Sequence, residues 1–158
     1  MSGGAHTHRY VARLAWSGST GDGFDAYTRA HEASCPPATH GQPLALTADP
    51  AFKGDPAKLN PEQLLVLAAS SCQLLSFLAV AARARIDVIA YDDDATGEMP
   101  DGRYPWVERI VLRPRVVFRG DVTDERVLHL LELAHRECYI ANSVKTAITL
   151  EPTLERVA

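Results

Sequence analysis

Residues 64–82 carry no charge and are mostly apolar, and this long run predicts a single long helix. Asn60 and Pro61 precede this run and are typical of a helix start. The Asn side chain accepts hydrogen bonds from free backbone N–H groups, and Pro supplies the fixed φ of the first helical position. Glu62 then places a negative charge in the first turn, where the helix dipole favours it. We therefore expect a helix that begins at Pro61.

This run is nearly long enough to cross a bilayer, since a helix rises about 1.5 Å per residue and a bilayer core is about 30 Å thick. Its composition argues against a membrane span. No aromatic belt marks either end, and polar residues crowd the centre, namely Ser70, Ser71, Gln73 and Ser76. A helix that is apolar on nearly all sides also suits the centre of a water-soluble fold, where other parts of the protein must cover it. We expect no membrane contact and infer a homodimer in which two subunits wrap their central helices together.

Alternating apolar and polar residues predict strands on both sides of this helix. Before it, three strands are expected, at residues 10–16, 24–31 and 44–47. After it, Asp101 and Gly102 mark the turn of a hairpin between two extended segments. A closing strand is expected at residues 144–150, after a turn at Asn142 and Ser143.

The second arm of that hairpin has the clearest strand pattern in the chain. Apolar residues alternate there with arginines and share one face of the strand: Ile110, Leu112, Pro114, Val116 and Phe118. Pro114 cannot donate a hydrogen bond to a sheet, so it indicates that this strand lies at a sheet edge or carries a bulge.

Apolar residues at three-and-four spacing predict a second helix within residues 121–138, "DVTDERVLHLLELAHREC". Its inward face is expected to hold Val127, Leu130, Leu131, Ala134 and Cys138. No repeat, low-complexity tract or linker interrupts the chain. The sequence thus predicts a single α+β domain over residues 1–158, with antiparallel β-sheets around a long central helix and a second helix.

The composition of the 158 residues excludes several function classes. Hydrophobic residues make up 46% and charged residues 23%, and the net charge of −4 leaves no basic excess to bind nucleic acid. The N-terminal segment lacks the apolar core of a secretory signal, which indicates a cytoplasmic protein. Thiols are reduced in that compartment, and three cysteines so far apart do not suggest a disulfide framework. Cysteine chemistry is therefore the candidate function.

Cys72 faces a physical obstacle to reactivity in the middle of the long helix. Apolar surroundings raise the pKa of a thiol above about 8.5. The helix dipole fades within the first turn and cannot reach Cys72. By residue type alone, Cys72 is an inert core thiol unless a cation approaches it from elsewhere. Cys138 also lies on an inward helix face, but a separation of 66 positions does not decide whether the two thiols meet. Cys35 is expected to be a loop thiol without a catalytic role.

Two segments resemble those of a known family. "LNPEQLLVLAASSC" is similar to the Asn-Pro-Glu-(Gln/Glu)-Leu…Ala-Cys helix of osmotically inducible protein C and the organic hydroperoxide resistance proteins. "AHRECYIANSV" resembles the second cysteine segment of the same family. The resemblance covers nearly the whole chain. It implies an α+β fold, an intertwined homodimer and thiol-dependent peroxidase activity.

The resemblance also implies roles for four residues. Cys72 matches the peroxidatic cysteine and Cys138 the resolving cysteine, while Glu62 matches the glutamate that pairs with an arginine near the reactive thiol. Arg29 is the arginine that we expect here, because the turn before it contains none and the later loop offers only lysines. Without the resemblance, Glu62 would be an ordinary acid at a helix start and Arg29 a solvated strand residue.

The implied function is reduction of organic hydroperoxides at Cys72, with Cys138 forming a disulfide and an external dithiol, such as a lipoyl group, as reductant. No bound cofactor is expected. No metal is expected either, since the chain has no CxxC or HExxH motif, although His135 and Cys138 are three residues apart. The chain departs from the family in two places. Many hydroperoxide reductases have proline where this chain has Tyr139, and Lys58-Leu59 replaces the family's threonine-rich approach to Asn-Pro. The alternative is therefore a stress-response protein of the same fold with a binding or structural role and little peroxidase activity.

Overall fold

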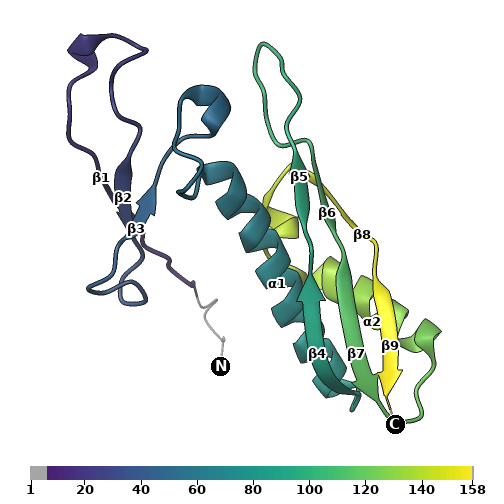
Figure 1. The fold of residues 1–158 in the computed structure, drawn as a ribbon. Coiled ribbons are helices and arrows are strands. Elements are labelled where there is room, and N and C mark those ends of the chain that lie inside the picture. The colour runs from purple at the N-terminus through teal and green to yellow at the C-terminus, as the bar shows by residue number, and fades with distance from the viewer. Residues whose placement is uncertain (1–6, 158) are drawn as a thin grey trace. The chain divides into compact units, whose positions relative to one another are not determined.

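The computed structural model describes residues 7–157, apart from the side chain of Asp22. The chain divides into two compact units, one ending at Pro61 and the other beginning at Glu62. Figure 1 shows strands β1 to β3 in the first unit, and strands β4 to β9 with helix α2 in the second. The combination of helices with separate sheets confirms the expected α+β class. The expected single domain stays a prediction.

The first unit contains a small antiparallel sheet in the order β1-β2-β3. Its strands are Arg13–Ala15 (β1), His31–Ser34 (β2) and Leu44–Leu46 (β3), with short 3-10 helices at Thr20–Asp22 and Pro50–Phe52. β3 confirms the strand predicted at residues 44–47. β1 is shorter than the strand predicted at residues 10–16, and all of its residues are exposed, although alternation of apolar and polar residues is typical of a half-buried strand.

The strand predicted at residues 24–31 is wrong except at its last residue, where β2 begins. Residues 24–29 instead form a compact loop. The Arg29 guanidinium stacks over the rings of Phe24 and Tyr27, at 4.9 and 3.7 Å from the ring centroids, and donates to the backbone carbonyls of both residues. These contacts between near neighbours favour a turn over an extended chain.

Both predicted helices are present. Helix α1 spans Pro61–Arg83 and starts at the predicted residue, and helix α2 spans Asp124–Glu137. Thr123 caps α2, because its hydroxyl accepts a hydrogen bond from the backbone N–H of Arg126 at 3.3 Å. The predicted inward face of α2 is confirmed, since all its members are buried: Val127, Leu130, Leu131, Ala134 and Cys138.

The strands of the second unit form two three-stranded sheets, β4-β7-β9 and β5-β6-β8. They span Asp87–Asp93 (β4), Thr96–Glu98 (β5), Arg109–Leu112 (β6), Pro114–Arg119 (β7), Ala147–Leu150 (β8) and Thr153–Val157 (β9). β4 pairs with β7 and β5 with β6, both antiparallel, which confirms the hairpin around Asp101 and Gly102. The expected antiparallel pairing thus holds for these pairs but not for the last two strands, because β8 runs parallel to β6 and β9 parallel to β7. β9 lies outside every predicted strand.

The strand pattern at residues 110–118 is interrupted at Arg113, which separates β6 from β7. The backbone N–H of Arg113 donates to the Asp93 carboxylate at 2.6 Å. Pro114 is therefore the first residue of β7, a position where a proline is tolerated in a sheet. β7 is the central strand of its sheet, and the register irregularity lies in β4. The prediction that Pro114 marks an edge or a bulge is thus wrong.

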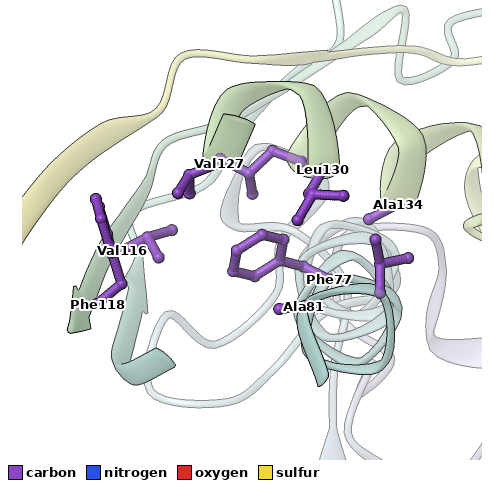
Figure 2. Packing of buried hydrophobic residues seen from close by; sticks show 9 residues of the cluster. Phe77, Ala81, Val116, Phe118, Val127, Leu130 and Ala134 are labelled. Carbon is purple, nitrogen blue, oxygen red and sulfur yellow. The ribbon is translucent and has the colours of Figure 1, made fainter. Parts of the chain in front are cut away.

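The core of the second unit lies between α1, α2 and β7, and Figure 2 shows the Phe77 ring among residues of α2 and β7. The buried cluster contains Phe77, Val80, Ala81, Val116, Phe118, Val127, Leu130, Leu131 and Ala134. The Phe77 ring also lies 6.0 Å from that of Tyr91 on β4. Gln73 is fully buried and donates to the backbone carbonyl of Leu131 at 3.2 Å. This bond fixes α1 against α2 next to Cys72.

By length and composition alone, α1 could cross a membrane, with a mean hydropathy of 2.1 over its most apolar window of 18 residues. The core helix of a water-soluble protein passes the same test, so this is weak evidence. One side of α1 is buried, through Ala69, Gln73, Phe77, Val80 and Ala81. Elsewhere the helix carries the exposed side chains of Leu67, Leu75 and Leu78. These leucines are uncovered in the part of the chain that the structure describes.

Candidate functional site

Two of the four predicted site residues, Cys72 and Cys138, lie next to each other, and their thiols share a hydrogen bond. Cys72 belongs to α1. Cys138 follows the last residue of α2 in an extended conformation, with φ −69° and ψ 114°, and its N–H donates to the carbonyl of His135 at 3.2 Å. Both thiols are free. Cys138 is 1% exposed, whereas Cys72 is partly exposed. Of these two thiols, only that of Cys72 is thus accessible to a ligand.

The pKa of the Cys72 thiol lies below its usual value. Burial alone would raise it, but hydrogen bonds outweigh burial; the donors are the backbone N–H of Ile140, the thiol of Cys138, the backbone N–H of Tyr139 and the hydroxyl of Ser76. Each bond favours the thiolate over the neutral thiol. The expectation that only a cation could activate Cys72 is therefore wrong, because uncharged donors already lower its pKa.

The pKa of the Cys138 thiol is shifted the other way. Burial raises it to about 11; the backbone N–H of Ala141 opposes this shift, and the adjoining Cys72 adds to it. As the pH rises, Cys72 therefore ionises first, while the Cys138 thiol stays protonated and donates a hydrogen bond to the Cys72 sulfur. The pair consists of an accessible thiolate and a buried, protonated partner.

Glu62 lies in the first turn of α1, as predicted. Its Oε2 atom is buried and accepts no hydrogen bond from any residue within 7–157. A buried carboxylate oxygen without a donor carries a substantial desolvation cost. The carboxylate of Glu62 could therefore bind a cation or accept a hydrogen bond from a group that does not contact it in this structure.

Arg29 lies in the first unit, held by the rings and carbonyls of Phe24 and Tyr27. It lines a cavity of about 490 Å³ in that unit, together with loop residues such as Trp16 and residues of β1 and β2. Its expected pairing with Glu62 stays a prediction.

Sequence reasoning missed the donors to Cys72 other than Cys138. Ser76 follows Cys72 by four residues on the same helix, so helical spacing could have indicated it. The backbone donors of Tyr139 and Ile140 carry no signature of residue type. The one available signal is that Tyr139 replaces the proline suggested by the resemblance, because every residue except proline supplies an N–H.

A tyrosine hydroxyl also lies buried near the thiol pair. Tyr91 Oη has no hydrogen-bond partner among the described residues. Burial raises the pKa of Tyr91, and the charges of Asp93 and Cys138 raise it further. The side chain therefore stays neutral at physiological pH.

His135 does not assemble a metal site with Cys138. Within residues 7–157, no group of three or more His, Cys, Asp or Glu side chains is placed to hold a metal ion. The Nδ1 atom of His135 is buried, without a hydrogen-bond partner in the described chain.

Comparison with known proteins bears on this arrangement. Residues 53–153 match the family described as OsmC-like protein. The chain belongs to the OsmC-like family. A solved structure from Vibrio cholerae, described as an OsmC-like protein of unknown function, is 32% identical to this OsmC-like protein. The match covers 92% of this chain and 99% of that one, with a TM-score of 0.82.

Two more distant structures are named for organic hydroperoxide resistance. The protein from Legionella pneumophila is 13% identical, with a TM-score of 0.66, over 95% of this chain and 98% of that one. The protein from Elizabethkingia anophelis, with crystallant-derived thiocyanate bound, is 17% identical, with a TM-score of 0.67, over 97% and 99%. At these identities the likeness shows the fold alone. No curated protein matches this OsmC-like protein.

Proposed function

We propose that this OsmC-like protein is a thiol peroxidase that reduces organic hydroperoxides through Cys72 and Cys138. The observation that carries the proposal is the opposite behaviour of the two adjoining thiols, since the pKa of Cys72 is lowered and that of Cys138 is raised. A peroxidatic cysteine must be an accessible thiolate, and a resolving cysteine must lie within its reach. Family membership and the neighbours named for organic hydroperoxide resistance support the same function.

In the first step, the Cys72 thiolate attacks the terminal oxygen of a hydroperoxide, ROOH. The O–O bond breaks, the alkoxide takes up a proton and leaves as the alcohol ROH, and Cys72 becomes a sulfenic acid. In the second step, the Cys138 sulfur loses its proton and attacks the Cys72 sulfur, while the S–O bond breaks and the hydroxyl leaves as water. The product is a disulfide. An external dithiol, for which we propose a lipoyl group, reduces it and is itself oxidised to a disulfide.

Apolar surface near Cys72 favours an alkyl hydroperoxide over hydrogen peroxide. Leu75 follows Cys72 by three residues on α1, so it lies on the same side of the helix, and it is 64% exposed. Burying an alkyl chain against such a side chain contributes about 25 cal/mol per Å² of apolar surface. Hydrogen peroxide has no apolar surface to bury.

The proposal extends to an arginine and a second subunit. The unpaired buried oxygen of Glu62 suits a guanidinium, for which Arg29 is our candidate. The other two exposed leucines of α1, Leu67 and Leu78, suit a helix face that a second copy of the chain covers, so we include a homodimer in the proposal.

The proposal is tested by consumption of cumene hydroperoxide in the presence of dihydrolipoamide. We expect turnover by the wild type and none by Cys72→Ser. Cys35→Ser is the matched control, since it removes an exposed thiol outside the pair and should keep full turnover.

Intact mass after one equivalent of peroxide gives an independent readout. The wild type should lose two hydrogens as the disulfide forms, whereas Cys138→Ser should gain oxygen. If the wild type consumes no peroxide with any dithiol, the peroxidase proposal fails and the alternative of a binding or structural role stands.

A further inference from the structure

The chain that follows α2 makes a tight turn beside Cys72. The backbone carbonyl of Cys138 accepts a hydrogen bond from the N–H of Asn142 at 3.0 Å. The carbonyl of Tyr139 accepts one from the hydroxyl of Ser143 at 2.6 Å. Two consecutive carbonyls are therefore fixed in direction by the residues that come after them.

The direction of these carbonyls also sets the direction of two N–H groups, because a trans peptide points its N–H away from its C=O. The N–H of Tyr139 shares a peptide group with the first carbonyl, and the N–H of Ile140 shares one with the second. Both N–H groups donate to the Cys72 sulfur. Within residues 7–157, no backbone carbonyl accepts a hydrogen bond from either of them. The sulfur is thus their partner.

We propose that the N–H groups of Tyr139 and Ile140 form a thiolate-binding element, and that Ser143 is the positioning residue that aims the second of them. Two N–H dipoles directed at one sulfur favour its anionic form, and they are in place before any substrate arrives. The element needs no charged side chain. The inference deepens the proposed function, since it rests on Cys72 being the nucleophile.

The test measures the rate of Cys72 alkylation by iodoacetamide against pH, in full-length protein carrying Cys35→Ser. Tyr139→Pro removes one N–H, and the ψ of 114° at Cys138 is close to the extended range that a residue before proline adopts. Tyr139→Ala keeps the N–H and removes only a side chain that is 79% exposed. We expect Tyr139→Pro to raise the midpoint of the profile by about one pH unit. Tyr139→Ala should stay close to the wild type.

The role of Ser143 is tested in the same assay. Ser143→Ala removes the hydroxyl that holds the Tyr139 carbonyl, so the midpoint should rise. Ser143→Thr keeps a hydroxyl and should restore most of the wild-type profile. If Ser143 had only a structural role, Ser143→Ala would lower the midpoint of unfolding but would leave the midpoint of the pH profile of Cys72 alkylation unchanged, so Ser143→Thr would have nothing to restore in that profile.

A replacement of the 139 amide by an ester decides the matter if Tyr139→Pro does not fold, because the ester removes the N–H without a proline ring. A raised midpoint in the proline or ester protein, with none in Tyr139→Ala, supports the proposal. Equal midpoints in all of them overturn it. The assay contains no peroxide, so this failure is distinct from absence of peroxide turnover in the wild type, which overturns the proposed function instead.

Discussion

At pH 8, iodoacetamide should label Cys72 at least about ten times faster than Cys138. With a pKa of about 11, Cys138 is a thiolate in about one molecule in a thousand at this pH. The pKa of Cys72 lies below 9.0, so at least about one molecule in ten carries the thiolate. Only the thiolate reacts, so these populations favour Cys72 about a hundredfold, and the greater intrinsic nucleophilicity of a thiolate with a higher pKa offsets about tenfold of this advantage. The 1% exposure of Cys138 widens the difference.

The measurement requires the Cys35→Ser background, because Cys35 is exposed and would also react. Samples are quenched at increasing times, unfolded and treated with a second, heavier label, and peptide mass spectrometry then gives the initial rate at each cysteine. Raising the pH from 8 towards 11 should speed the labelling of Cys138 more than that of Cys72. Equal initial rates at pH 8 would refute the assignment of the thiolate to Cys72.

Three substitutions test the framework that holds the pair. Phe77→Ala should lower the free energy of unfolding by about 3–5 kcal/mol in urea denaturation, because its fully buried ring leaves a cavity; a loss below about 1 kcal/mol would contradict the packing. Gly97→Ala should cost about 1–3 kcal/mol, since its Cβ would lie 2.6 Å from Val66 Cγ2, and the cost should shrink in a Val66→Ala background. Thr123→Ala should cost about 1 kcal/mol in the same assay and Thr123→Ser little, because the hydroxyl caps α2; equal losses would exclude the cap.

The helices of this protein could be predicted because their signals are local. Pro61 marks the start of α1, and the spacing of apolar residues gives the buried face of α2. The strands depend on partners far along the chain. β9 pairs in parallel with β7, for example, and nothing within Thr153–Val157 encodes that partner. The strand predicted at residues 24–31 failed for a local reason, because the stacking of Arg29 on nearby rings favours a loop over an extended chain.

The site could be predicted only in part. Glu62 follows from the helix-start pattern, and its place in the first turn is confirmed. The contact between Cys72 and Cys138 could be expected from the family resemblance, but no local pattern encodes a contact across 66 positions. The backbone donors at residues 139 and 140 could not be predicted from the sequence, because almost every residue type has a backbone N–H and only the path of the chain determines its direction.

The contact between Cys72 and Cys138 also bears on how the second unit resists unfolding. A bond between them would close a loop that contains strands β4 to β7 and the whole of α2. Closing a loop of this length removes chain entropy from the unfolded state worth about 4 kcal/mol at 25 °C, by the simplest polymer argument. The second unit would then be most resistant to unfolding after an oxidant had formed the disulfide. Its resistance to a protease would stay raised until a reductant broke that bond.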